Sequence, residues 1–208
     1  MILIGQFDSP FVRRVAIAMT LYGLSFEHRP WSVFGDAEKI RPYNPLVRVP
    51  VLILDDGTAL IESHAILDYV DSLVPHGHAM LPSAEPTRRQ ALKVAALATG
   101  VADKAVSLFY EKRLHQDVSG VWVDRCCAQI SGALAVLESD RAGRPSAYWF
   151  GDRIGHADIA VAVALRFLAE SHPGLIAWKE YPALGAHAAR LEGLPVFQAV
   201  LQPFHVPG

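Results

Sequence analysis

The spacing of apolar residues changes near residue 80, and this change constrains the fold more than any other feature of the chain. Before it, short apolar runs typical of strands alternate with segments whose apolar residues recur at helical spacing. Residues 75–86, "PHGHAMLPSAEP", are rich in proline and in small or polar residues, as linkers are. Beyond them the helical spacing continues to the C-terminal part of the chain. The sequence therefore predicts two domains of different class.

Residues 1–76 predict a small α/β domain. The expected order is strand, helix, strand, short helix, two strands and helix, and the last two strands form a hairpin through Asp56–Gly57. The segments with this pattern are "ILIGQ", "PFVRRVAIAMTLYGL", "SFEHRPW", residues 36–42, "PVLIL", "TALI" and "SHAILDYVDSLV". The expected fold is a four-stranded mixed sheet packed against helices.

Residues 77–85 are assigned to the linker and residues 86–208 to an all-helical domain without strands. Long helices are expected over residues 86–115 and 119–140. The segment "HADIAVAVALRFLAE" is apolar nearly all round, which predicts a helix at the centre of the helical domain.

Asp158 is assigned a structural role at the start of this apolar helix. Gly155 takes the N-cap position, so Asp158 stands at N3, and no cap hydroxyl is present. The carboxylate of Asp158 can accept from the free N–H groups of the first turn and interact with the helix dipole.

The composition excludes several classes of function. The chain has 208 residues, 51% of them hydrophobic, and a formal net charge of −2 without a basic cluster, so a nucleic-acid partner is not expected. The apolar run "IAVAVAL" is far shorter than a membrane span, and no membrane partner is expected. The N-terminal "MILIGQFDSP" has no basic region or cleavage site of a signal peptide and is interpreted as a strand. A cytoplasmic protein is predicted.

The cysteines and linker histidines do not predict a redox or metal site. Cys126 and Cys127 are adjacent, which suits neither a disulfide framework nor a C-x-x-C motif, and they are interpreted as packing thiols of a helix. His76 and His78 lie in the linker without a third ligand nearby. No metal is expected.

Val49–Pro50 stands where the third strand should begin. One interpretation is structural, because a proline is tolerated at the first residue of a strand. The other is a cis peptide bond that turns the Val49 N–H and C=O outward to pair with an extended peptide. Sequence leaves both open.

Glu62–Ser63 precedes the last helix of the first domain. Ser63 is a good N-cap, which is a sufficient structural reason for its presence. The same helix N-terminus, however, offers N–H groups and a positive dipole to a carboxylate, and Glu62 beside it can hold an ammonium group. Together the two residues suit the head group of a zwitterionic amino acid.

Ser9 is followed by Pro10 and a helical segment, as an N-cap is followed by proline at N1. Its hydroxyl oxygen can accept from the helix backbone while its proton remains free to donate. A thiol bound there would meet a hydrogen-bond donor and a helix N-terminus. Both favour the thiolate and lower a reference thiol pKa of about 8.5.

Five segments of the chain can be compared with known families: "SPFVRR", "NPLVRVPVL", "ESHAILDYV", "ALATGVAD" and "GDRIGHADIAVA". Together they resemble the cytosolic glutathione S-transferases of bacterial, serine-class type. The resemblance covers essentially the whole chain.

This resemblance implies a thioredoxin-like N-terminal domain, an all-helical C-terminal domain and a homodimer. Glutathione would be a cosubstrate, with no permanently bound cofactor. By match to the family motifs, Ser9 is implied as the catalytic, thiol-activating hydroxyl. The residues implied to bind glutathione are Arg48, Val49, Pro50, Glu62 and Ser63.

The implied activity is conjugation of the glutathione thiolate to a small apolar electrophile. Phe11, Phe109, Tyr110 and Arg113 are candidates for the electrophile pocket, although aromatic residues at helical spacing are also typical of a core. The alternatives are a non-catalytic glutathione-binding or interaction protein on the same fold, and a glutathione-dependent isomerase or peroxidase.

Two departures from the family pattern bear on these expectations. Thr99 stands where relatives often have an aspartate that reaches toward the partner subunit's glutathione. No cysteine stands at or near position 9, so the nucleophile is expected to be the glutathione sulfur and not a protein thiolate.

Overall fold

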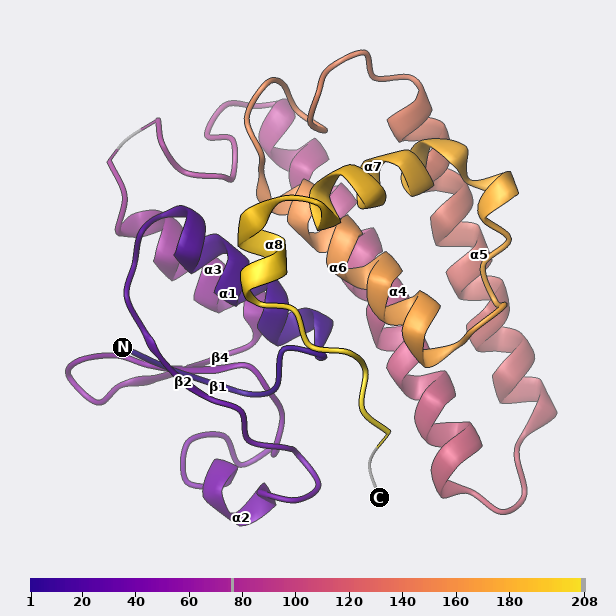
Figure 1. Cartoon of the computed structure of the whole chain (residues 1–208), viewed down its shortest axis with the longest axis horizontal. Coiled ribbons are helices and arrows are strands. Elements are labelled where there is room, and N and C mark those ends of the chain that lie inside the picture. The colour runs from indigo at the N-terminus through magenta and orange to yellow at the C-terminus, as the bar shows by residue number, and fades with distance from the viewer. Residues whose placement is uncertain (76, 207–208) are drawn as a thin grey trace. The chain divides into compact units, whose positions relative to one another are not determined.

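The computed structural model describes residues 1–75 and 77–206. Contacts between Cα atoms divide the chain into two compact units. The first unit comprises Met1–Met80 together with the residues from Leu194 on, and the second, helical unit comprises Leu81–Gly193 (Figure 1).

A four-stranded mixed sheet forms the first unit, as the sequence predicts. Its strands are β1 (Ile2–Ile4), β2 (Glu27–Arg29), β3 (Val51–Ile53) and β4 (Ala59–Ile61). They lie in the order β2-β1-β3-β4, with β1 parallel to β2 and the other two pairs antiparallel. The hairpin between β3 and β4 turns at Gly57, where φ is +86°.

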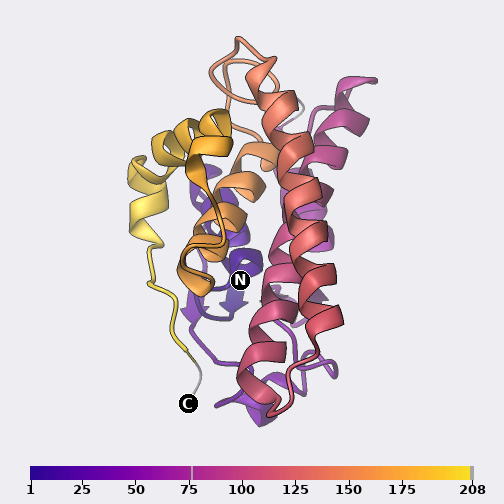
Figure 2. The same cartoon turned by 90° about the vertical axis from the view of Figure 1, so that its right-hand side faces the viewer.

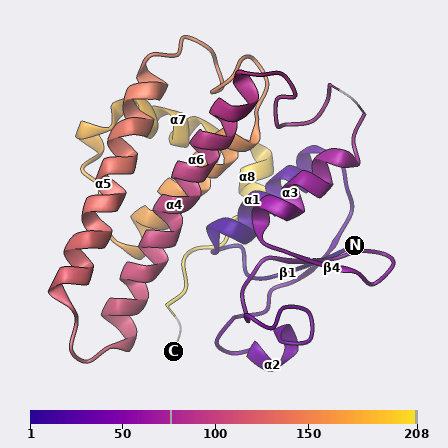
Figure 3. The same ribbon diagram turned by 180° about the vertical axis from the view of Figure 1, so that it is seen from behind.

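Helices α1 (Pro10–Leu21) and α3 (Ser63–Ser72) pack against each other, and Figures 1 and 3 show them side by side. Val12 and Val15 on α1 and Ile66 and Val70 on α3 are fully buried, and each pair stands three or four residues apart, so its members lie on one face of their helix. The short helix α2 (Ala37–Ile40) contributes Ile40 to a separate cluster with strand residues Ile4, Val51 and Ile53.

The C-terminal residues differ from the sequence-based division, which assigns all of 86–208 to the helical domain. Helix α8 (Pro195–Ala199) packs on α1 within the first unit. The guanidinium of Arg13 donates from Nη2 to the Phe197 carbonyl at 2.9 Å and from Nε to the Val200 carbonyl at 3.2 Å. The Phe197 side chain is fully buried. These contacts, which link residues far apart in sequence, hold α8 on α1.

Four α-helices and one short 3-10 helix form the helical unit. They are α4 (Thr87–Leu114), α5 (Gly120–Ala142), α6 (His156–Ser171), the 3-10 helix η1 (Trp178–Glu180) and α7 (Pro182–Glu192). Helix α4 packs on both α5 and α6, and Figure 2 shows α4 and α5 running alongside each other. The described residues of this unit form no strand, only an isolated bridge between Tyr148 and Gly151. Helix α6 is buried on nearly all sides, as its apolar sequence predicts.

The carboxylate of Asp158 joins the start of α6 to the preceding loop. Its Oδ2 accepts from the Gly155 N–H at 2.9 Å and its Oδ1 from the Trp149 N–H at 2.8 Å. Asp158 is only 1% exposed, and burial raises its pKa despite these two hydrogen bonds. His187 Nε2 lies 3.3 Å from Asp158 Oδ1 without forming a hydrogen bond. Burial lowers the pKa of His187 to about 3, so its ring is neutral at pH 7.

None of the helices in the described part of the chain is long and apolar enough to cross a membrane.

Candidate functional site

Ser9 caps the first helix. Its backbone is extended (φ −70°, ψ 122°), and its Oγ accepts a hydrogen bond from the Val12 N–H at 3.4 Å. Pro10 follows at N1, where a missing N–H costs no helical hydrogen bond. A hydroxyl accepts through its oxygen and donates through its proton. Ser9 can therefore still donate to a ligand group at the N-terminal end of α1.

Gly5 brings the start of α1 close to the segment before β3. Its φ is +127°, and a Cβ at this position would lie 2.5 Å from Val12 Cγ2 and 2.8 Å from Val49 Cβ. Both the backbone conformation and the available space require glycine here. The helix that begins after Ser9 and the segment that contains Val49 thus meet at one point.

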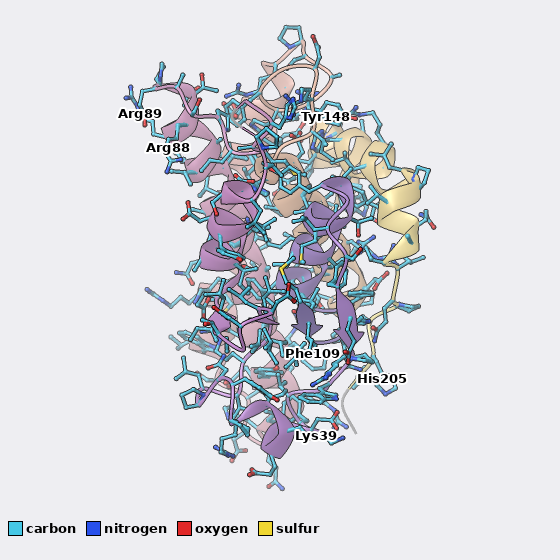
Figure 4. All side chains as sticks on the ribbon, turned by 90° about the vertical axis from the view of Figure 1, so that its left-hand side faces the viewer. Lys39, Arg88, Arg89, Phe109, Tyr148 and His205 are labelled. Carbon is cyan, nitrogen blue, oxygen red and sulfur yellow. The ribbon has the colours of Figure 1, made fainter. Side chains whose placement is uncertain are left out.

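The loop that leads to Ser9 is held from two sides. The Phe7 ring stacks on the His28 ring with their centroids 3.8 Å apart, and His28 Nε2 lies 2.8 Å from the Gly5 carbonyl oxygen. From the C-terminal segment, Gln202 Oε1 accepts from the Phe7 N–H at 2.9 Å. The backbone N–H of His205, labelled in Figure 4, donates to Asp8 Oδ2 at 3.2 Å. Burial raises the pKa of Asp8.

Val49 leaves its backbone open next to the sheet. The Val49–Pro50 peptide bond is cis, and β3 begins only at Val51. Neither the N–H nor the C=O of Val49 forms a hydrogen bond with any described residue. An extended peptide can therefore pair with these two groups.

Asn44 fixes the loop that presents Val49. It is 1% exposed, its Nδ2 donates to the Arg48 carbonyl at 2.9 Å, and its Oδ1 accepts from the Leu46 N–H at 3.1 Å. Asn44 is not among the site residues that the sequence predicts. The signal is its place before Pro45, in a turn where an asparagine side chain commonly bonds to nearby backbone.

Glu62 has a backbone conformation that is rare for a residue with a side chain. Its φ is +67° and its ψ is 121°. Such a conformation costs on the order of 1–3 kcal/mol and is found most often where function depends on it. Glu62 takes the N-cap position of α3, but its side chain forms no capping hydrogen bond, so the first N–H groups of α3 have no side-chain cap.

Ser63 is not the N-cap of α3, so the structural interpretation of its presence as a helix cap is wrong. It is the first residue of α3, and Glu62, with its positive φ, takes the N-cap position before it. The helix therefore begins one residue earlier than an N-cap at Ser63 would predict. Its hydroxyl oxygen instead accepts a hydrogen bond from Arg14 Nη1 at 3.3 Å. Ser63 is 2% exposed and so lies at the floor of any site at this helix end.

Arg48 and Glu62 face each other across the site. Arg48 Nη1 lies 3.6 Å from Glu62 Oε1, and about half of each side chain is exposed. Exposed ion pairs of this kind contribute little to stability. Both side chains are therefore accessible to a charged ligand.

The four electrophile-pocket candidates lie in different units. Phe11 is half-buried on α1, two residues after Ser9. In the helical unit lies Phe109 on α4, which Figure 4 labels. The centroids of its ring and the Tyr110 ring lie 6.0 Å apart, and its ring meets the His172 ring edge-on with the centroids 6.5 Å apart. Arg113 is exposed near the C-terminal end of α4.

Thr99 and the two cysteines have local roles. The Thr99 hydroxyl donates to the Ala95 carbonyl at 3.0 Å, one turn earlier in α4. Cys126 is buried and Cys127 is partly buried on α5, and the two form no disulfide. Burial raises the pKa of the Cys126 thiol, which disfavours a reactive thiolate.

His76, one of the linker histidines, lies outside the described residues. Within residues 1–75 and 77–206, no group of three or more His, Cys, Asp or Glu side chains is arranged to hold a metal ion.

Comparison with protein-family models gives two matches along the chain. Residues 3–79 match the model described as "Glutathione S-transferase, N-terminal domain". Residues 120–190 match "Glutathione S-transferase, C-terminal domain". The first match includes every residue from Ser9 to Ser63 discussed above.

Individual relatives and solved structures agree with these matches. A GST-like protein of Escherichia coli K12, YibF, is 30% identical over 80% of this chain and 81% of its own. Mouse maleylacetoacetate isomerase is 28% identical over 95% of this chain and 90% of its own. Among solved structures, a glutathione S-transferase from Methylobacterium radiotolerans in complex with glutathione sulfonate has a TM-score of 0.92. It is 28% identical, and the match covers 100% of this chain and 97% of that one.

Proposed function

Because the chain belongs to the glutathione S-transferase family, we propose that its first unit binds glutathione and that Ser9 stabilises the glutathione thiolate for attack on a small apolar electrophile. The observation that carries the proposal is the combination of three open features in one unit. They are the donor hydroxyl of Ser9, the unpaired backbone of Val49 and the uncapped N-terminus of α3 beside Glu62.

Each part of glutathione has a complementary group. The γ-glutamyl carboxylate lies at the N-terminus of α3, where it accepts from Ser63 and from backbone N–H groups. The carboxylate of Glu62 holds the γ-glutamyl ammonium group. The cysteinyl unit pairs with the backbone of Val49 beside Pro50, and Arg48 contributes positive charge for a carboxylate of the ligand.

Catalysis follows from the position of the thiol. Bound at the N-terminal end of α1, the thiol loses its proton to water, and the resulting thiolate accepts a hydrogen bond from Ser9 and interacts with the positive end of the helix. The sulfur lone pair then forms a bond to the electrophilic carbon, and the leaving group departs with the electrons of the bond that breaks. The enzyme supplies position and thiolate stabilisation.

A second candidate is a glutathione-dependent isomerase. The similarity to mouse maleylacetoacetate isomerase, which extends over 95% of this chain, favours it. In an isomerase the sulfur adds to the substrate and is released again, so glutathione is not consumed. The same thiolate site serves both reactions.

The family relationship also supports a cytoplasmic homodimer as part of the proposal. Light scattering coupled to size-exclusion chromatography tests the dimer directly.

The experiment that tests the proposal has two steps. Calorimetric titration with glutathione measures binding, and an aryl-halide conjugation assay measures turnover. We expect binding in the micromolar to millimolar range and measurable conjugation. Binding without turnover of aryl halides or of cis-alkene substrates would support a non-catalytic glutathione-binding protein, and absence of glutathione binding would refute the proposal.

A further inference from the structure

Residues 201–206, the C-terminal segment, continue along the first unit after helix α8 ends. They form neither helix nor strand, and they pass the N-terminal end of α1 beside the loop that leads to Ser9 (Figure 1). The segment thus belongs to the same unit as the candidate site.

Two hydrogen bonds join the C-terminal segment to the two residues directly before Ser9. Gln202 Oε1 accepts from the Phe7 N–H at 2.9 Å, and the His205 N–H donates to Asp8 Oδ2 at 3.2 Å. Among the described residues, the Phe7 N–H has no other acceptor. The backbone before Ser9 therefore depends on a side chain that stands 195 positions further along the chain.

Contacts with the C-terminal residues fall on both sides of Ser9. On the helical side, Arg13 donates to the carbonyls of Phe197 and Val200, which stand just before the segment. On the loop side are the two hydrogen bonds described above. Because Ser9 lies between these contacts, they limit how far its backbone can shift.

The capping contact of Ser9 is too long to fix its hydroxyl. Its Oγ accepts from the Val12 N–H at 3.4 Å, beyond the usual range of about 2.7–3.2 Å. A catalytic group that is displaced by ~1 Å can lower the rate ~100-fold. The hydroxyl therefore needs support from the backbone of the loop that carries it.

The groups proposed to bind the peptide part of glutathione are held by other contacts. Val49 follows the loop that Asn44 fixes, and Glu62 takes the N-cap position of α3. A change in the C-terminal segment should therefore affect the bound sulfur and leave the peptide contacts in place.

We propose that the C-terminal segment positions the Ser9 hydroxyl toward the glutathione sulfur, with Gln202 as the positioning residue. This inference rests on the proposed function. The hydrogen bonds to Phe7 and Asp8 hold the loop, so that Ser9 donates to the thiolate in a fixed direction. Gln202 acts through the backbone from Phe7 to Ser9 and not on the sulfur itself.

The test compares glutathione with S-methylglutathione, which has the same peptide but no ionisable thiol. Gln202→Leu removes the acceptor of the Phe7 N–H and keeps a side chain of similar size. Calorimetric titration should give an affinity for S-methylglutathione within about twofold of the wild type, because the peptide contacts remain. Ultraviolet absorbance of the bound thiolate should show a thiol pKa raised by about 0.5–1. At a pH below this pKa, kcat should then fall about three- to tenfold, because the thiolate is the nucleophile.

A matched pair of variants tests the second hydrogen bond. His205→Pro removes the N–H that donates to Asp8, whereas His205→Ala removes the imidazole and keeps that N–H. We expect His205→Pro to raise the pKa of the bound thiol and His205→Ala to leave it at the wild-type value.

A double variant tests whether the segment acts through Ser9. In a Ser9→Ala background, Gln202→Leu should cause no further change in kcat or in the bound thiol pKa. A general loss of structure would lower kcat in both backgrounds.

The outcomes distinguish the inference from the function on which it rests. If the wild type binds neither ligand, the proposed function fails. If Ser9→Ala raises the bound thiol pKa but Gln202→Leu and His205→Pro leave it unchanged, the inference alone fails. An equal loss of kcat from Gln202→Leu with and without the Ser9 hydroxyl would also overturn the inference. Should Gln202→Leu not fold, equal thiol pKa values in His205→Pro and His205→Ala would overturn it.

Discussion

Replacement of Asp158 by alanine tests how the start of α6 is stabilised. The change removes the acceptors of two backbone N–H groups, the buried Trp149 N–H at 2.8 Å and the partly buried Gly155 N–H at 2.9 Å. A buried donor without a partner costs about 1–3 kcal/mol, and a partly buried one costs less. The gross loss is therefore about 2–4 kcal/mol.

A compensating gain reduces this loss. The raised pKa of Asp158 indicates that desolvation disfavours the carboxylate more than its two hydrogen bonds favour it. Removing the buried charge restores part of the free energy, so we expect a net destabilisation of about 1–3 kcal/mol. For a protein of this size the melting temperature should fall by about 2–12 °C.

Thermal and urea unfolding of Asp158→Ala measure this change. The matched control is Asp152→Ala, because Asp152 is exposed in the loop before the same helix, and its replacement should change stability by less than about 0.5 kcal/mol. The affinity for glutathione should be the same in the folded Asp158→Ala variant, since the proposed site lies in the other unit. A melting temperature equal to that of the wild type would show that the loop and helix do not depend on this carboxylate.

Three other predictions concern strain, pH and the C-terminal segment. Glu62→Gly should raise the free energy of unfolding by about 1 kcal/mol, because glycine tolerates φ +67°. The same variant should bind glutathione at least tenfold more weakly. Chemical unfolding and calorimetry measure the two effects, and a variant that is less stable than the wild type or binds glutathione as tightly would contradict the prediction. For His187, the folded pKa of about 3 lies below the ordinary 6.5, so the unfolded chain binds the extra proton. Stability should therefore fall as the pH is lowered from 6.5, with a slope of up to about 1.4 kcal/mol per unit, and urea titrations of His187→Phe should show a smaller slope. Gln202→Ala removes the acceptor of the Phe7 N–H in the loop that leads to Ser9, and it should lower kcat about three- to tenfold in the conjugation assay. An unchanged kcat would show that the C-terminal segment does not help to position Ser9.

Local patterns in the sequence are sufficient for the strands and helices of residues 1–75 and for helices α4, α5 and α6. The β3–β4 hairpin follows from two apolar runs around Asp56–Gly57, and α6 follows from an apolar segment after Gly155. Such features depend on residues close together in the chain, and the spacing of apolar residues predicts them directly.

Features that depend on residues distant in sequence were not predictable in the same way. The place of α8 on α1 depends on Arg13, and nothing near Arg13 in the sequence distinguishes it from any other arginine of a helix. The same holds for Arg14, since only the packing of α1 on α3 shows that its guanidinium is buried against Ser63.

Ser63 shows how one backbone angle changes the interpretation of a motif. A serine before an apolar helix predicts an N-cap, and that prediction fails here because Glu62 adopts a positive φ. Sequence gives no sign of this conformation, since glutamate rarely adopts it. Glu62 and Ser63 are ligand-binding candidates because of the family resemblance and the open helix end, neither of which depends on the N-cap assignment.

The most direct test of the central claim is the pKa of the glutathione thiol bound to the protein, measured by ultraviolet absorbance of the thiolate in wild type and in Ser9→Ala. The proposal predicts a bound pKa clearly below the reference thiol value of about 8.5 in the wild type and a return toward that value in Ser9→Ala. The rate of conjugation should fall in parallel by about one to three orders of magnitude, with a modest change in KM. An identical thiol pKa and rate in the two proteins would contradict the account and leave Ser9 as a helix cap alone.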